Sequence, residues 1–355
     1  MANLHQHCTV TAVRGFHITK PHWTPNAGDI LDNQCDISKR QSSRMTQREL
    51  HNYKCTLSDE LLEKAKKELT EDPDTRKQEI QTLRERLLRY PGLKSRVDDV
   101  FLLKFLRARK FDQERTFSLI LNYYQMKKEN EDIYTNMTPK SVKPLLDSEV
   151  VTVLPKPSKF GETVIIFRGG RWNPEKYPIE EIFRVSFLVN SAVIESEEAQ
   201  VNGVRYINDL TDFGWAQAKT FTPTFAKKFS TLIQDAFPMR VKGIHYLHEP
   251  ALFEYVFSII KPFLKEKLRK RLHFLGENVE GLHEYIDPEN LPEEYAGKLP
   301  SICSQEYFER LLTHEQEFED DAKFGFLSMT IQQPSKKSQD AMESLPGTFK
   351  KLNVD

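Results

Sequence analysis

From residue 150 onward the chain alternates between short runs rich in β-branched and aromatic residues and longer stretches with helical periodicity. This alternation constrains the fold strongly, because strands separated by helices favour a mainly parallel sheet that helices cover. The predicted strands are residues 150–154, 163–167, 204–208, 241–247 and 272–275, and the predicted helices between them are 178–196, 222–235 and 250–262. The sequence therefore predicts an α/β domain over residues 145–315.

The region before this domain carries helical patterns only. Ser58 can cap a helix in which apolar residues recur at helical spacing from Leu61 to Leu69. After Asp98 the pattern predicts an inward set, Phe101, Leu102, Phe105 and Leu106, and an outward set, Lys104, Arg107, Arg109 and Lys110. We expect a small all-helical domain over residues 57–130, a disordered tail at 1–56 and a flexible tail at 330–355.

The charge balance narrows the choice of partners. The chain has 51 basic and 52 acidic residues, whereas nucleic-acid binders carry a surplus of Lys and Arg. Its four cysteines form no Cys-x-x-Cys pair, which suits a reducing compartment. No apolar run approaches the roughly 18–20 residues that span a bilayer, and the N-terminus shows no apolar signal core. We expect a cytoplasmic, monomeric protein without a nucleic-acid partner.

The sequence shows none of the common catalytic signatures. It has no Walker-type phosphate loop, no dinucleotide-binding glycine motif and no Gly-x-Ser-x-Gly elbow. His245 and His248 are three residues apart, but they fall on a predicted strand and at its exit rather than on one helical face. We expect no enzymatic activity, no catalytic residue, no metal and no cofactor.

The most informative stretch runs from residue 252 to residue 271. Its apolar residues follow a helical stripe and are Phe253, Val256, Phe257, Ile260, Phe263 and Leu264. Its basic residues gather at the C-terminal end and are Lys261, Lys265, Lys267, Arg269, Lys270 and Arg271. The stretch is either an ordinary amphipathic helix with a solvated end or a membrane-facing helix whose basic flank meets anionic headgroups.

Two further features each allow two interpretations. Arg240 and Lys242 lie two apart on a predicted strand, so both project from one face, toward solvent or toward a phosphate. Large apolar side chains, from Phe183 to Phe237, either form a plain core or line a pocket. Periodicity alone does not separate these alternatives.

Several runs together resemble the CRAL-TRIO lipid-binding family, and within it the tocopherol-transfer branch, over residues 57 to 315. In one-letter code they are FLLKFLRARKFD at 101–112, QVNG at 200–203, FPMRVKGIH at 237–245 and IKPFLKEK at 260–267. The resemblance implies a sheet covered by helices, a mobile helical lid over a lipid cavity, and a preceding all-helical domain.

The resemblance also implies specific site residues. The positions that bind a phosphatidylinositol bisphosphate headgroup correspond to Arg240, Lys242, Lys267 and Arg271. The positions of the lid that contact the membrane correspond to Phe253, Val256 and Ile259, and we assign Phe257 and Ile260 of the same helix to this surface as well. The lipid-cavity positions correspond to Phe183, Ser186, Phe187, Asn190, Val204, Tyr206, Phe213, Phe229, Leu232 and Ile233.

The cavity residues depart from those of the tocopherol carrier at three places. Asn190 replaces a serine, Tyr206 a small residue and Phe213 a tryptophan. The added bulk and polarity reshape the expected cavity, so the cargo is expected as a tocopherol- or retinoid-like lipid without a single identity.

The function implied is that of a lipid-transfer protein. It would hold one hydrophobic ligand as cargo and exchange it at membranes that contain phosphatidylinositol bisphosphate. Its expected location is the cytoplasm, with transient peripheral association with endosomal or other phosphoinositide-bearing membranes. The alternative is a phosphoinositide-binding trafficking or sensor module whose cavity lipid is structural.

Overall fold

The computed structural model describes residues 53–301 and 305–327. The tail predicted at 330–355 and most of the tail predicted at 1–56 lie outside these residues. The last part of the N-terminal tail, residues 53–56, is described and contacts the sheet domain. The Tyr53 hydroxyl and the Thr56 backbone N–H donate to the Glu197 carboxylate at 2.5 and 2.6 Å.

The helical part consists of α2 (Asp59–Leu69), α3 (Arg76–Leu88), α4 (Asp99–Ala108) and α5 (Gln113–Glu129). Ser58, Asp98 and Asp112 cap α2, α4 and α5, each accepting a hydrogen bond from a backbone N–H of the first turn. Next, α6 (Glu131–Tyr134) and α7 (Pro139–Asp147) pack against α8 (Ile179–Val193) and lead into the sheet.

The sheet has the order β2-β3-β4-β5-β6. Its strands are β2 (Val151–Val153), β3 (Thr163–Arg168), β4 (Val204–Asp209), β5 (Val241–Leu247) and β6 (Leu272–Phe274). The edge strand β2 is antiparallel to β3, and the other neighbours are parallel. The mainly parallel sheet that the alternation predicts is therefore confirmed.

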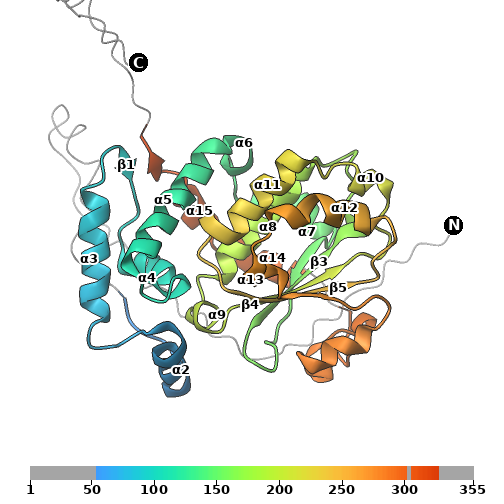
Figure 1. Ribbon diagram of the computed structural model, residues 1–355, viewed down its shortest axis with the longest axis horizontal. Helices are drawn as coiled ribbons and strands as arrows, with labels where there is room; N and C mark the ends of the chain where they lie inside the picture. The colour runs from blue at the N-terminus through green and yellow to red at the C-terminus, as the bar shows by residue number, and fades with distance from the viewer. Residues whose placement is uncertain (1–52, 302–304, 328–355) are drawn as a thin grey trace, which may run out of the picture.

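Helices cover one face of this sheet (Figure 1). They are α8, α10 (Trp215–Ala218), α11 (Pro223–Thr231) with its π-helical continuation η2 (Leu232–Ala236), and α12 (Phe253–Ile260). The short helix α9 (Glu197–Asn202) leads into β4 and packs against α2 and α4. The 3-10 turn η3 (Lys261–Phe263) and α13 (Glu266–Arg269) connect α12 to β6. On the other face lie the turns η4 (Val279–Glu284), η5 (Pro288–Asn290) and η6 (Glu293–Tyr295).

Alternation along the strands divides the buried residues between two cores. Ile165 on β3 and Ile244 on β5 belong to the large core beneath the helices. Ile207 on β4 and Leu247 on β5 belong to a smaller core on the opposite face. Because successive side chains of a strand point to opposite faces, the sequence positions of these residues determine which side of the sheet each serves.

A C-terminal strap, defined here as residues 305–327, ties the two parts together. It contains α14 (Gln305–Leu312), α15 (Glu315–Asp321) and β7 (Gly325–Phe326). The strand β7 pairs antiparallel with β1 (Leu93–Lys94) of the helical part. In addition, Lys127 and Tyr123 on α5 donate to Asp321 at 2.8 and 3.1 Å. Residues beyond 315 thus pack on the helical part of the chain.

The expectation that Lys104 and Arg107 face outward is wrong. Arg107 is fully buried, and its guanidinium bonds Glu71 at 2.8 and 2.9 Å, Glu197 at 2.9 Å and Gln200 at 2.7 Å. Lys104 is also buried and forms an ion pair with Glu195. The physical reason is that α9 of the sheet domain packs on the face of α4 that the sequence pattern marks as polar. The helix α4 is therefore covered on two sides.

We predict that Arg107→Met destabilises the protein by about 3 kcal/mol, because it removes one of the two guanidinium groups, those of Arg107 and Arg76, that pair with the buried Glu71 carboxylate. Arg89→Met is the matched control, since Arg89 lies on the surface of the same helical part and forms an exposed ion pair with Glu85. We expect the control to change stability by less than about 1 kcal/mol. Urea unfolding of both variants measures the difference, and equal effects would contradict a central role for Arg107.

Candidate functional site

The sheet face beneath the helices is not fully covered. Tyr206 and Asn208 lie on β4, the middle strand, and Tyr246 lies on the neighbouring β5. All three are only half-buried, although β4 is flanked by strands on both sides and covered by helices. These three side chains therefore keep accessible surface on strands that are otherwise enclosed.

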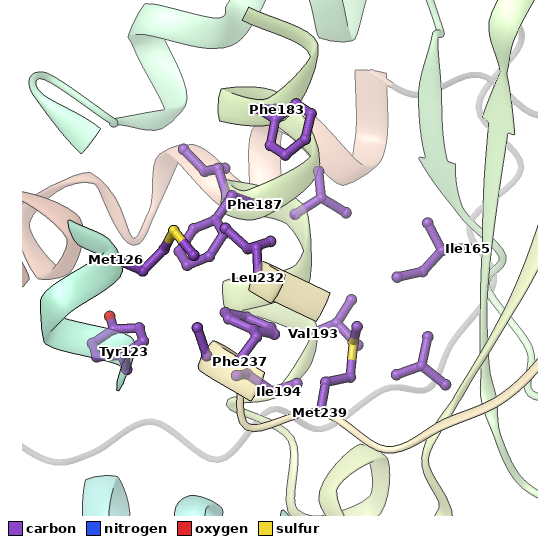
Figure 2. Packing of buried hydrophobic residues seen from close by; sticks show 14 of the residues in the cluster. Tyr123, Met126, Ile165, Phe183, Phe187, Val193, Ile194, Leu232, Phe237 and Met239 are labelled. Atoms are coloured by element: carbon purple, nitrogen blue, oxygen red, sulfur yellow. The ribbon is translucent and has the colours of Figure 1, made fainter. Parts of the chain in front are cut away.

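Aromatic side chains from α8 and α11 pack in the core on the helix-covered side of the sheet. The Phe183 ring lies 4.6 Å from that of Phe225 and 5.2 Å from that of Phe229, both in edge contacts. Phe187, one turn further along α8, contacts Phe237 at 4.7 Å. Figure 2 shows how side chains of α5, α8, η2 and β3 meet in the same core.

The predicted cavity residues fall into three groups. Those buried in or packed against the large core are Phe183, Phe187, Val204, Tyr206, Phe229, Leu232 and Ile233. The polar residues Ser186 and Asn190 are half-buried and follow Phe183 at helical spacing on the same face of α8. Phe213 lies apart from the others, in a separate cluster beneath α12 with Leu210, Ala218, Phe253 and Val256.

Two of the cavity residues form a polar pair. The Tyr206 hydroxyl donates to the Asn190 side-chain oxygen at 2.8 Å and lies 3.5 Å from the Met239 sulfur. Burial raises the pKa of Tyr206, so its hydroxyl stays protonated. The pair therefore places neutral hydrogen-bonding groups in otherwise apolar surroundings. Sequence reasoning identified both positions but not their contact.

The predicted lid, α12, lies closed over the sheet. Phe253 is 8% exposed and Val256 1% exposed, and the Phe253 ring lies 5.0 Å from that of Tyr246. Phe257, Ile259 and Ile260 are half-buried. The apolar stripe that we expected at the membrane therefore faces inward in this state.

Different residues occupy the outer side of the lid. Tyr255 on α12 is 46% exposed and Trp215 on α10 is 60% exposed, with ring centroids 5.5 Å apart. Phe274 at the end of β6 is also exposed and lies 5.1 Å from Phe257. Sequence analysis missed Trp215 and Phe274, because each stands outside the periodic stripe.

The lid is followed in the chain by η3 and the basic residues up to Arg271. We call the connection at residues 261–265 the hinge, and hydrogen bonds hold it in place. The Gln234 side chain on η2 donates to the Phe263 carbonyl at 3.0 Å and accepts from the Lys265 backbone N–H at 2.7 Å. Lys265 also forms an ion pair with Asp235. The lid, the hinge and α13 thus form one crossover between β5 and β6, residues 253–271, held at its middle by η2.

The four predicted headgroup residues come from the amino ends of β5 and β6. Arg240 and Lys242 flank the first residue of β5, Lys267 lies on α13, and Arg271 immediately precedes β6. Partial burial, together with the positive charge of Arg240, lowers the pKa of Arg271. Partial burial and the charge of Arg271 likewise lower the pKa of Lys267. The four cations therefore share one electrostatic environment.

Gly203 explains how β4 approaches this basic cluster. Its φ of +92° lies in the region that side chains disfavour, and a Cβ there would lie 2.5 Å from the Arg240 carbonyl oxygen and 2.8 Å from the Lys242 side chain. A residue with a side chain would push the two cations aside. The QVNG run thus serves the geometry of the basic cluster.

A pocket of about 420 Å³ adjoins Lys267. Its basic lining residues are Arg109, Arg115, Lys265 and Lys267, and its acidic ones are Glu114 and Asp235. Both carboxylates are engaged, Glu114 with Arg86 at 2.6 Å and Asp235 with Lys265. The pocket therefore extends the positive surface toward the helical part. Sequence analysis did not assign Arg109 or Arg115 to the site, although the basic run at 107–110 was a signal.

Within the described ranges, 53–301 and 305–327, no helix combines the length and apolar character needed to cross a bilayer. Across the same residues, no three side chains of the metal-binding types gather at one place. His245 is buried against Arg205 at 2.8 Å, whereas His248 contacts Asp209 at 3.0 Å. The two histidines thus have separate partners.

Comparison with known proteins matches residues 147–297 to the CRAL/TRIO domain and residues 72–143 to a Pinta-like UBA domain. The mouse alpha-tocopherol transfer protein-like is 39% identical over 267 residues, covering 75% of this chain and 78% of its own. Human clavesin-2 is 35% identical over 286 residues, covering 79% and 87%.

A solved structure, that of Sfh5, covers 70% of this chain and 99% of its own at 16% identity, with a TM-score of 0.42 that is too low to support a functional comparison. The two curated relatives match over most of their lengths and over most of this chain. Their extent and identity, together with the domain match, show that the chain belongs to the CRAL-TRIO family of lipid-binding and lipid-transfer proteins.

Proposed function

We propose that this protein carries one hydrophobic lipid between its sheet and the helices α8, α11 and α12, and exchanges it at phosphoinositide-bearing membranes. The observation that carries the proposal is the crossover 253–271, which joins the apolar lid to two of the four clustered cations. A single segment thus contacts both the cargo space and the anion site. In this proposal the protein is a carrier and has no catalytic role.

The cargo chemistry follows from the residues that lie between β4 and the helices covering it. These are mostly aromatic and aliphatic, with the Tyr206–Asn190 pair as a hydrogen-bonding point. Such a lining fits an apolar molecule with one hydroxyl or carbonyl end, the class that includes tocopherol- and retinoid-like lipids. The pair can turn toward such a group, because each partner can both donate and accept.

The energetics explain why exchange would need a membrane. A cargo that buries on the order of 400 Å² of apolar surface gains roughly 10 kcal/mol, at about 25 cal/mol per Å². Release into water gives up most of this free energy and is correspondingly slow. Release into a bilayer keeps the cargo in apolar surroundings, so the barrier falls where the protein docks.

The anion site supplies a way to open the lid at that place. A headgroup that binds Lys267 and Arg271 acts on α13, and α13 is joined to α12 through only the short turn η3. If the headgroup binds the open state more tightly, it shifts the population toward that state. The hydrogen bonds of Gln234 hold the hinge in the closed state, and in this proposal they break when the lid opens.

We predict that the double variant Lys267→Ala/Arg271→Ala binds phosphatidylinositol bisphosphate vesicles at least about tenfold more weakly, since each cation–phosphate contact contributes about 1 kcal/mol or more. The matched control is Arg269→Ala/Lys270→Ala, which removes the same charge from exposed positions of the same segment. Co-sedimentation and vesicle-to-vesicle transfer of a bound fluorescent lipid are measured on both. Equal loss in the two variants would show a diffuse charge effect and contradict the site. Normal phosphoinositide binding by the wild type without cargo transfer would favour a sensor module.

We predict that Phe253→Asp lowers stability by about 3 kcal/mol or more, because the closed lid would bury an unpaired carboxylate. Tyr255→Asp, on the outer side of the same helix, should change stability by less than about 1 kcal/mol. It should nevertheless slow transfer, because a charge on the outer face resists entry into the bilayer. Thermal unfolding and transfer rates test both, and an unchanged melting temperature for Phe253→Asp would mean that the lid is open in solution.

A further inference from the structure

The basic cluster already contains an acidic group from the helical part of the chain. A single carboxylate oxygen of Glu68, on α2, accepts from Arg240 at 3.0 Å and from Lys242 at 3.2 Å. Against the effect of partial burial, these two hydrogen bonds lower the pKa of Glu68. The carboxylate therefore stays ionised and occupies the position between the two cations where a phosphate oxygen would bind.

The backbone of Glu68 is fixed, whereas its side chain has freedom. Ala65 and Leu69 on the same helix are fully buried and pack in one cluster with Val201 of α9. Lys64 adds a hydrogen bond to the Asn202 side chain at 2.7 Å. The Glu68 side chain, by contrast, is 35% exposed. It can leave the two cations by rotating into solvent, without any movement of α2.

The other half of the cluster is open. Among the residues that the structure describes, no carboxylate lies within 4.0 Å of the charged nitrogens of Lys267 or Arg271. The Arg271 guanidinium donates instead to the Val241 backbone carbonyl, which carries no charge. An anion approaching the cluster therefore meets two cations without a carboxylate partner on one side, and on the other side two cations that share the single negative charge of Glu68.

We propose that Glu68 is a built-in competitor that holds the Arg240–Lys242 half of the site until a multiply charged inositol headgroup displaces it. This inference rests on the proposed function. A lipid with one negative charge gains too little at Lys267 and Arg271 to displace the carboxylate as well. A bisphosphate gains contacts at both halves and repels Glu68 toward solvent. Glu68 thereby raises selectivity at the expense of affinity.

The test is Glu68→Gln, with Glu63→Gln as the matched control, since Glu63 is an exposed residue of the same helix and its substitution changes the net charge equally. Binding is measured to phosphatidylcholine vesicles containing either phosphatidylinositol bisphosphate or phosphatidylserine. We expect Glu68→Gln to bind both at least about threefold more tightly, with the larger gain for phosphatidylserine, because the competitor no longer reduces the fraction of open sites. Glu63→Gln should bind as the wild type does. Unchanged or weaker binding by Glu68→Gln, or an equal gain in Glu63→Gln, overturns the proposal.

A second arm separates the headgroup from other sources of affinity. Calorimetry with soluble inositol trisphosphate removes any contribution of the lid, and inorganic phosphate tests whether the inositol ring matters. A gain in Glu68→Gln for inositol trisphosphate supports the proposal. A gain for vesicles only overturns it, because the effect would then come from the lid.

The double variant Lys267→Ala/Arg271→Ala separates a failure of the headgroup site from a failure of the competitor role of Glu68. If it binds phosphoinositide vesicles as the wild type does, the headgroup site itself fails. If it binds weakly while Glu68→Gln shows no gain, the site stands and the competitor role of Glu68 fails. Melting temperatures are compared throughout, and a loss of both stability and binding in Glu68→Gln assigns Glu68 a purely structural role.

Discussion

The buried guanidinium of Arg107 joins the parts of this protein that define its site. It lies on α4 of the helical part and bonds Glu71, just after α2, together with Glu197 and Gln200 on α9 of the sheet domain. A buried charge is tolerated only when its partners surround it, so these elements have one mutual arrangement. The helix α2 is consequently held beside the first residues of β5, and the basic cluster is bounded by two domains rather than one.

This arrangement gives the crossover between β5 and β6 an unusual position. One end of it lies over the sheet, where the lid covers Tyr246, and the other end lies beside the helical part, where Lys267 lines a basic pocket. The two ends are connected through η3, where Gln234 holds the middle of the segment by two hydrogen bonds. In the proposed function, one short piece of chain therefore contacts both the cargo and the membrane.

Sequence patterns predicted the strands of the five-stranded sheet almost residue by residue, because buried strands are short apolar runs with clear limits, but they did not predict β1 and β7. They were wrong for Arg107, because its polar side chain lies on a helix face that another domain covers. Hydrophobic periodicity along the sequence does not reveal that another domain packs on that face. They identified the apolar stripe from Phe253 to Ile260 but not whether it faces the core or the membrane, because the sequence pattern is the same for a closed lid and an open lid. Glu68 escaped notice since its partners are over 170 positions away in the chain.

The pairing of β1 with β7 has a consequence for the order in which the molecule is completed. Leu93 belongs to the part that leaves the ribosome first, yet its strand partner Phe326 is synthesised after the whole sheet domain. Asp321, which binds Lys127 on α5, is equally late. Domains generally fold in the order of synthesis. The contacts of Phe326 and Asp321 with the helical part can therefore form only after the whole sheet domain has been synthesised.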